Sequence, residues 1–458
     1  MNTLSAKRFP TDSLPGVLLF RSHPDLMATL LLCMLSLFMT LQYLCILPPL
    51  LCNGAQLLIG ICSLTLCFLV VGKAKLRRYL LFIGVYTSFG IVSFFYNGNA
   101  DVIELLWPLG YMSTSLLLVF FRPNIKVCQS VFYGYCAAIL LWVTLAGDVD
   151  AAGFNASRNM ISVHLLTLLG IYLISVRKAG ERFSVMTFLC AIFLCMISRG
   201  RSAVFLAGIF ALYLLVCLVF DRKAMRVCGK LDLLFWAVMA LIYFYPILRT
   251  IQLPRFDPPA PPEITVPEVP GQSELPTQPE LPTQPEIPEA PVEPPQLNNT
   301  VKQGIENLQA RGLRSSRIGI WKDYLKKAGA SFTDLLFGAT IGGTPILDEF
   351  TTNLHNSFFM LHAKYGLLGL LLVLVAMVCS GWRYLMQRNI HYLFLMAALF
   401  WRMNLDYTNF NGILDILLVF LIFYPVLNQN EQGKKKLPSE KQRKEERVRE
   451  TVQWIFVR

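Results

Sequence analysis

The sequence contains few charged residues: Asp, Glu, Lys and Arg make up 15% of its 458 residues, against about 25% in soluble domains. Hydrophobic residues make up 55% of the chain, and the mean hydropathy is +0.51. This balance excludes an ordinary soluble globular protein. The apolar runs are continuous rather than alternating, which argues against membrane-spanning strands. The sequence therefore predicts an all-α polytopic membrane protein.

The sequence also lacks the signs of a metal site. Its 12 cysteines have no metal-ligand spacing, and most lie in apolar runs, where cysteine packs as a small core residue. No Asp-x-Asp pair accompanies the candidate site residues named below, so we expect no metal and no cofactor. No cleavable signal peptide is evident, because the first apolar run is long and is followed at once by others.

Twelve apolar segments approach the length of about 20 residues that a helix needs to cross a bilayer. Most of the 41 lysines and arginines fall in the termini and in alternate loops, which the positive-inside rule places in the cytoplasm. These loops explain the net charge of +12 without a nucleic-acid partner. Both termini are expected in the cytoplasm, with the spans at 26–47, 55–72, 79–96, 102–121, 127–146, 159–176, 185–198, 203–220, 233–248, 357–379, 392–403 and 412–427.

The spans and loops divide the chain into five parts. Nine helices occupy 1–248, a Pro/Glu-rich linker 249–300, a loop with site elements 301–356, three helices 357–427, and a basic cytoplasmic tail 428–458. In the linker, the hexapeptide Glu-Leu-Pro-Thr-Gln-Pro at 274–279 is repeated at 280–285. Because proline fixes φ and removes a donor, we expect an extended, partly disordered spacer in this large outer loop.

The second half of the outer loop is rich in helix formers. Arg311, Arg314 and Arg317 recur every three residues, so a helix would gather them along one side. Trp321 and Tyr324 continue an amphipathic surface that suits a membrane interface. A short cationic helix beside a bilayer fits an anionic lipid head group, and the alternative is an ordinary solvated helix face.

Two other places suggest chemistry on the outer side. His355-Asn356 lies just before an apolar segment, so a titratable imidazole is expected at a membrane–water boundary. Arg199 and Arg201 share the five-residue connection Ser-Arg-Gly-Arg-Ser, on the face that the charge rule disfavours. The alternative for the arginines is a tight turn from which they reach lipid phosphates.

Three patches together resemble a known superfamily, the bacterial O-antigen ligases and the related O-antigen and capsule polymerases. His355-Asn356, with Gly366 and Gly369 after them, resembles the ligase pattern of His, a polar residue and a spaced Gly-x-x-Gly. Ser-Arg-Gly at 198–200 resembles the family's arginine at the head of a membrane helix. Arg317 before a Trp, running on to a glycine-rich turn, resembles the arginine of the family's periplasmic loop. The likeness covers about residues 185–425, and the Pro-rich repeat departs from it.

The resemblance implies transfer of a glycan from undecaprenyl diphosphate to a hydroxyl of lipid A core, at the periplasmic face of the bacterial inner membrane. Membrane lipids and a lipid-linked acceptor are then the partners. His355 is expected to be the base, since histidine side chains ordinarily titrate near pH ~6.5. Asn356 would orient the base or hold a sugar hydroxyl. The diphosphate would be bound by Arg199 or Arg201, with Arg317 and Arg314.

Several assignments stay open. Arg199 fits Ser-Arg-Gly, while Arg201 fits the small residues that follow it. The family's late acidic residue corresponds to Asp406 or, in competition, to Asp415. Asp406, His362 and Arg158 are placed in supporting positions; His362 follows His355 by two helical turns, and interior packing is its alternative.

Three other functions compete with ligation to lipid A core. A polymerase would use the same donor and join the glycan to a second undecaprenyl-linked repeat. A secondary transporter or flippase also accommodates twelve spans, although the two halves show no repeat and intramembrane acids are scarce. A scaffold with a Pro-rich stalk would leave His355 and the outer arginines unexplained.

Overall fold

The computed structural model describes residues 22–99, 105–146, 159–244, 316–342, 354–408 and 412–427. Within these ranges the chain is almost entirely helical, and the β pairing there is a short parallel one between β1 (Phe183–Ser184) and β2 (Met225–Arg226). Among the described helices, 7 are long and apolar enough to cross a membrane. These long helices are α2 (Pro24–Tyr43), α3 (Pro49–Val70), α4 (Lys73–Asn97), α7 (Ile125–Ala146), α8 (Asn159–Ala179), α10 (Arg201–Phe220) and α16 (Ser357–Met386). The predicted class, an all-α membrane protein, is therefore confirmed.

Shorter helices complete the described part of the chain. Four of them are apolar: α6 (Tyr111–Phe120), α9 (Val185–Ile197), α17 (Ile390–Leu405) and α18 (Asp415–Leu427). The others are α11 (Lys230–Phe244), α13 (Ser316–Ala328), α14 (Phe332–Phe337) and the 3₁₀ turns η2 (Trp107–Leu109) and η3 (Arg222–Ala224). The predicted linker at 249–300 and tail at 428–458 lie outside the described residues.

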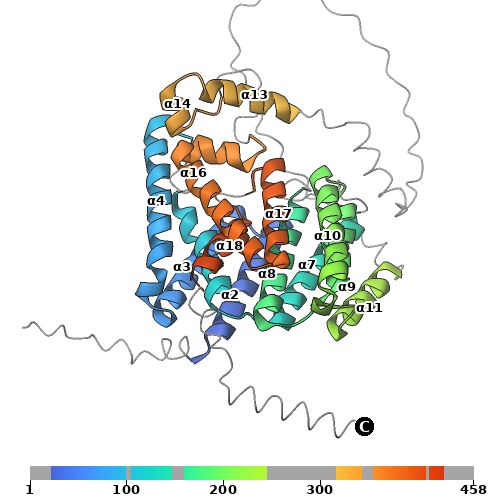
Figure 1. Cartoon of the computed structure of the whole chain (residues 1–458). Coiled ribbons are helices and arrows are strands. Elements are labelled where there is room, and N and C mark those ends of the chain that lie inside the picture. The colour runs from blue at the N-terminus through green and yellow to red at the C-terminus, as the bar shows by residue number, and fades with distance from the viewer. Residues whose placement is uncertain are drawn as a thin grey trace, which may run out of the picture.

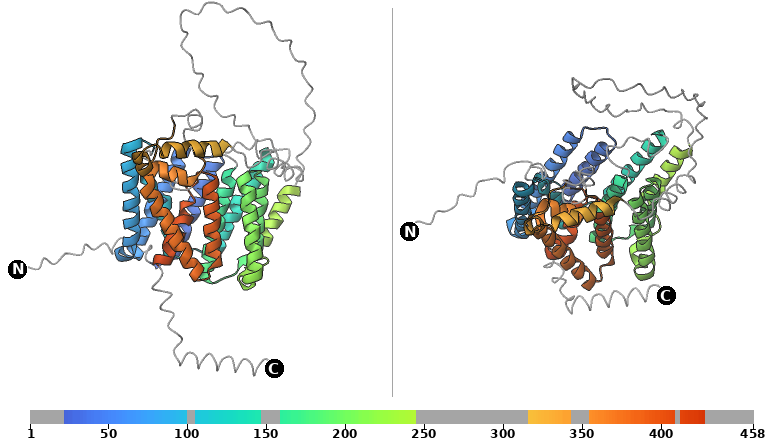
Figure 2. Two further views of the ribbon diagram at one scale, coloured as in Figure 1. Left: turned by 45° about the horizontal axis from the view of Figure 1, so that its top comes forward. Right: turned by 90° about the horizontal axis from the view of Figure 1, so that it is seen from above.

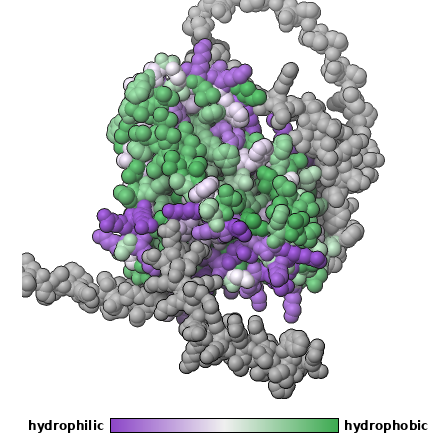
Figure 3. All heavy atoms as spheres, viewed as in Figure 1, coloured by the Kyte–Doolittle hydropathy of each residue, from purple (hydrophilic) through white to green (hydrophobic). Residues whose placement is uncertain are grey.

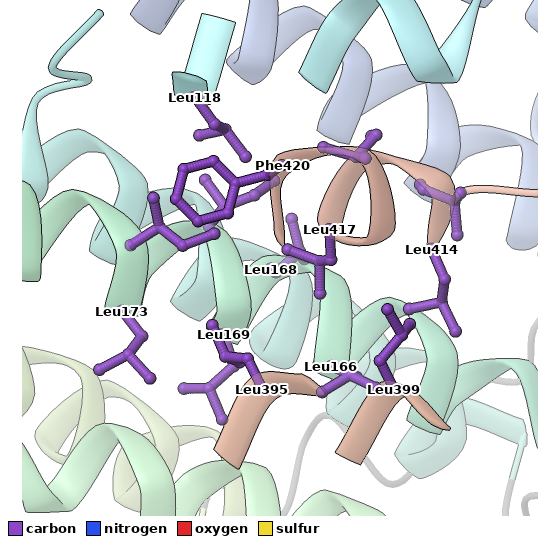
Figure 4. Close-up of a cluster of buried hydrophobic side chains, with 14 of the residues drawn as sticks. Leu118, Leu166, Leu168, Leu169, Leu173, Leu395, Leu399, Leu414, Leu417 and Phe420 are labelled. Atoms are coloured by element: carbon purple, nitrogen blue, oxygen red, sulfur yellow. The ribbon is translucent and has the colours of Figure 1, made fainter. Parts of the chain in front are cut away.

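The core of the bundle forms around α8. All residues from Ile161 to Val176 are buried, as expected of a helix that is apolar on every side. Leu166 and Leu169 of α8 lie beside Leu399 and Leu395 of α17 (Figure 4), and Leu417 of α18 belongs to the same buried cluster. A Cβ atom added at Gly170 would lie 2.7 Å from Leu417, so the small residue permits this close helix packing.

The surface has an apolar belt between two hydrophilic ends (Figure 3). Basic residues collect at one end, where neighbouring helices begin or finish. There the guanidinium of Arg78 donates to the carbonyl of Val426 (3.3 Å), the backbone N–H of Arg122 donates to Asp25 (2.8 Å), and Lys178 donates to the end of α6 (2.6 Å). The belt exposes large apolar side chains, which is the pattern of a membrane-embedded surface.

The opposite end carries α13, which lies across the bundle rather than along it (Figures 1 and 2). This is called the α13 end below. The side-chain amide of Asn97, at the close of α4, donates to the carbonyls of Phe337 (3.1 Å), Gly338 (2.9 Å) and Ala363 (3.0 Å). Asn99 donates to Ala363 as well (2.9 Å). Two asparagines therefore join α4, the end of α14 and the first turns of α16.

Helix α16 is in two pieces, whereas the sequence predicted one span over 357–379. Gly366 has φ 68° and ψ −177°, a conformation that L-residues rarely adopt, and it separates Ser357 to Tyr365 from the rest of the helix. Carbonyl groups just before such a break lose their intrahelical donors. The carbonyl of Ala363 accepts hydrogen bonds from the side-chain amides of Asn97 and Asn99 instead. The first piece, called the half-helix, crosses the α13 end while the second descends through the bundle (Figure 1).

Replacing Gly366 with alanine is expected to destabilise the α13 end. The new Cβ would lie 2.4 Å from the carbonyl oxygen of Leu336, and overpacking costs about 1–3 kcal/mol beyond the ~1–3 kcal/mol of strain in a backbone region that is essentially restricted to glycine. Gly180→Ala is the matched control, because Gly180 has φ 71° but open space around it. Thermal unfolding in detergent should show the larger drop for Gly366→Ala; equal drops would mean that the close approach is unimportant.

Candidate functional site

The His355 segment is shaped by its backbone. His355 has φ 51°, an uncommon conformation for a residue with a side chain. Asn356 follows as the N-cap of α16: its side-chain oxygen accepts from the N–H groups of Phe358 (2.9 Å) and Phe359 (3.1 Å), and its amide donates to the carbonyl of Asn404 (3.2 Å). Asn356 therefore fixes the loop that holds His355, which agrees with an orienting role.

His355 meets Asp406 at the end of α17. Nδ1 of the imidazole lies 3.4 Å from Oδ1 of Asp406, and the two side chains are 29% and 14% exposed. The hydroxyl of Ser357 donates to the backbone carbonyl of Asp406 (2.8 Å) and accepts from the N–H of Thr408 (3.0 Å). The acid is thus held against the histidine by the first residue of α16.

Two guanidinium groups flank Asp406. Nη2 of Arg402 lies 3.7 Å from Oδ2 of the carboxylate, and Arg317 of α13 donates to the carbonyl of Leu405. Burial alone would raise the pKa of Asp406, but the hydrogen bond with His355 and the charges of Arg402 and Arg317 outweigh it and lower the pKa. The carboxylate is ionised at neutral pH and can only accept a hydrogen bond, so a neutral His355 ring makes this contact with its hydrogen on Nδ1, which leaves Nε2 as its acceptor nitrogen.

The positive charge of Arg201 affects the pKa of Arg317. Burial lowers the pKa of Arg317, the charge of Asp406 opposes this, and the charge of Arg201 adds to the lowering. A guanidinium keeps its charge through such shifts. Arg201 begins α10, and Arg199 lies two residues before it with φ 52°. The charge of Arg201 thus reaches the group around Asp406 through its effect on Arg317, and Arg199 belongs to the same connection.

Helix α13 is anchored to the His355 segment by aromatic side chains. The indole N–H of Trp321 donates to the carbonyl of Leu354 (2.9 Å). Tyr324 lies 2.7 Å from Nδ1 of His362, whose Nε2 lies 2.8 Å from the carbonyl of Leu335. Both ring nitrogens of His362 are therefore used to hold α13 and α14, so this histidine supports the site through packing rather than by touching His355.

Asp406, rather than Asp415, is the acid beside His355. Asp415 is buried at the start of α18, where its Oδ2 accepts from the N–H of Gly412 (3.1 Å). Two predicted residues, Arg158 and Arg314, lie outside the described residues. Among the residues that the structure does describe, no group of three His, Cys, Asp or Glu side chains is placed to hold a metal ion; metal independence stays a prediction.

Arg402 was missed by the sequence argument. It lies in a predicted span, where an arginine costs about 2.5–3.5 kcal/mol on insertion scales, and it precedes Asp406 by four residues, the spacing of a helical ion pair. Both signals were present in the sequence. Lys364 was also missed: its ammonium lies 3.3 Å from the hydroxyl of Tyr407, on the residue next to Asp406.

Comparisons with protein-family models, with curated proteins and with solved structures return no match. The chemistry of the site therefore rests on its own geometry. An imidazole is paired with a partly buried carboxylate, and guanidinium groups from α10, α13 and α17 act on it directly or through one another. This arrangement can accept a proton and stabilise a dispersed negative charge within one small region.

Proposed function

We propose that this chain is an inner-membrane glycosyltransferase of the O-antigen ligase type. It transfers a glycan from undecaprenyl diphosphate to a hydroxyl of a lipid-linked acceptor. The observation that supports this most strongly is the 3.4 Å approach of His355 to Asp406 beside Arg402 and Arg317. A lone base would serve many reactions, but a base surrounded by guanidinium groups suits a phosphate-bearing substrate.

In the proposed topology the four shorter apolar helices and α11 also cross the bilayer, giving twelve spans with both termini in the cytoplasm. The basic end around Arg78, Arg122 and Lys178 is then cytoplasmic, in keeping with the positive-inside rule. The α13 end faces the periplasm, where the lipid-linked glycan and its acceptor meet.

The proposed reaction is a single displacement. The acceptor hydroxyl attacks the anomeric carbon as Nε2 of His355 takes its proton, and the bond from that carbon to the diphosphate breaks. The electron pair leaves with undecaprenyl diphosphate, and the anomeric centre is inverted. Asp406 stabilises the imidazolium that forms. Arg317 and Arg201 stabilise the charge growing on the diphosphate, with Arg199 beside them.

A deletion strain distinguishes the two acceptors. Loss of a ligase leaves full-length polymer that is not attached to lipid A core, whereas loss of a polymerase leaves single repeats on lipid. Gel analysis of lipopolysaccharide and of the undecaprenyl-linked pool reports both. An unchanged glycan profile in that strain would contradict glycan transfer altogether and favour the transporter or scaffold interpretations.

The two arginines of the 199–201 connection are expected to differ in their effects. Arg201→Gln should raise the KM for the lipid diphosphate about 10-fold or more, as expected for loss of a charged hydrogen bond worth ~1.5–3 kcal/mol. Arg199→Gln should have the smaller effect, because Arg201 is the one that acts on Arg317. Arg222→Gln, exposed at the basic end, is the control. A larger effect at Arg199 would reverse the assignment.

A further inference from the structure

Arg402 is a fully buried guanidinium in an apolar helix. It has 0% exposure and lies among buried neighbours such as Leu399 and Met403 of α17. Within the described part of the chain, its Nε and Nη1 atoms have no hydrogen-bond partner. Burying a charged group of this kind costs free energy, so a retained one is expected to have a function. The contacts of its remaining nitrogen, Nη2, indicate that function.

Nη2 of Arg402 connects two parts of the site. It lies 3.7 Å from Oδ2 of Asp406 and donates to the backbone carbonyl of Asn159 at the start of α8 (3.2 Å). The side-chain oxygen of Asn159 in turn accepts from Ser202 (3.3 Å). A Cβ atom at Gly200 would lie only 2.4 Å from that oxygen, so the connection before α10 packs directly on Asn159.

These contacts form a continuous path from the arginine-bearing connection to the histidine. We propose that Arg402 is a positioning residue for the reaction proposed above: it fixes the Asp406 carboxylate against Nδ1 of His355 and, through Asn159, ties this pair to the segment that carries Arg199 and Arg201. The inference rests on the proposed function for its kinetic readout, but the alignment itself is a property of the protein alone.

The sign of the pH effect follows from the charges around Asp406. They are His355 from the loop before α16, Arg402 from α17 and Arg317 from α13. Removing the charge of Arg402 takes away one of the groups that lower the pKa of Asp406, so that pKa rises. A nearby cation disfavours an added proton on the His355–Asp406 pair, so without Arg402 the pair keeps its proton to higher pH. The neutral imidazole, which acts as the base, then forms only at higher pH, so the acid limb of the rate profile moves to higher pH.

Two substitutions separate positioning from packing. Arg402→Met keeps the length and removes the charge; it should lower transfer about 10–100-fold, by analogy with groups that orient metal-binding histidines, and move the acid limb upward. Arg402→Lys keeps the charge, so its acid limb should stay at the wild-type pH with a smaller loss of rate. Arg383→Met is the control, since Arg383 also donates to a backbone carbonyl, that of Pro425 (3.4 Å), at the basic end. Loss of rate in Arg402→Met without a shifted limb would overturn the proposal.

A spectroscopic measurement keeps the two proposals apart. The chain has only 5 histidines, so few ¹⁵N-labelled imidazole signals are expected. The signals of His355 are identified by their absence from the spectrum of His355→Gln. The wild type and Arg402→Lys should show the Nδ1–H tautomer, and Arg402→Met a mixture with a higher titration midpoint. If the wild type transfers no glycan but these signals behave as described, the proposed function fails and the positioning role stands. Unchanged His355 signals in Arg402→Met would refute the positioning role even if transfer is observed.

Discussion

Replacing His355 with glutamine is expected to lower glycan transfer by about 10²–10⁴-fold, the usual contribution of a general base. The glutamine amide can neither take the hydroxyl proton nor form the cation that Asp406 stabilises. Donor binding should change little, because the guanidinium groups remain in place. The measurement is turnover of a lipid diphosphate-linked glycan by the purified protein in nanodiscs, with KM and kcat determined separately.

The chain supplies a matched control for this substitution. His391 also faces a carboxylate, with its Nε2 3.1 Å from Asp221, and its Nδ1 lies 2.6 Å from the hydroxyl of Tyr213. This pair lies at the basic end, where α10 finishes and α17 begins. His391→Gln should therefore transfer glycan at close to the wild-type rate. Equal losses in the two variants, or full activity of His355→Gln, would eliminate His355 as the base.

Replacing Arg317 with glutamine should lower kcat/KM by about 10²–10³-fold, as for loss of one charged donor at a developing negative charge. Arg317 is the residue of α13 that reaches the end of α17, where it donates to the carbonyl of Leu405. Arg317→Lys keeps the charge but loses the planar fork, so it should recover only part of the activity. The measurement is again steady-state transfer, with donor concentration varied.

Exposed cations on the same helix show whether charge alone matters. Lys322→Gln and Lys326→Gln each remove one positive charge from α13 but lie on its exposed side. They should leave kcat/KM nearly unchanged at physiological salt, where exposed charges are screened. A similar loss in all three variants would mean that α13 attracts the donor through its overall field, without a specific contact from Arg317.

The sequence predicted the residues of the site better than their arrangement. His355 and Arg317 were recognisable from local motifs, whereas Asp406 was one of two acids suggested by position alone; the structure places His355 against Asp406 with Arg317 nearby. The choice between Asp406 and Asp415 required the fold, because Asp406 ends one apolar segment and Asp415 begins the next, and only the packing of α17 against the His355 loop distinguishes them.

Contacts between distant parts of the chain explain what the sequence could not show. The amide of Asn97 reaches the carbonyl of Ala363, 266 positions away, and no local pattern predicts such a pairing. The break at Gly366 was hidden because the apolar residues on either side of it read as one continuous span. Arg402 was overlooked since a single arginine hardly changes the hydropathy of a long apolar run.

The turn at Gly366 also decides the direction of an electric field. An α-helix carries about half a positive charge at its amino end. The half-helix begins at Ser357, beside His355, and runs across the α13 end before the chain turns down into the bundle. Its amino end therefore presents this partial charge sideways, along the plane of the head groups. An unbroken span would have aimed the same dipole through the bilayer, where an anionic head group lying flat at the surface would have felt little of it.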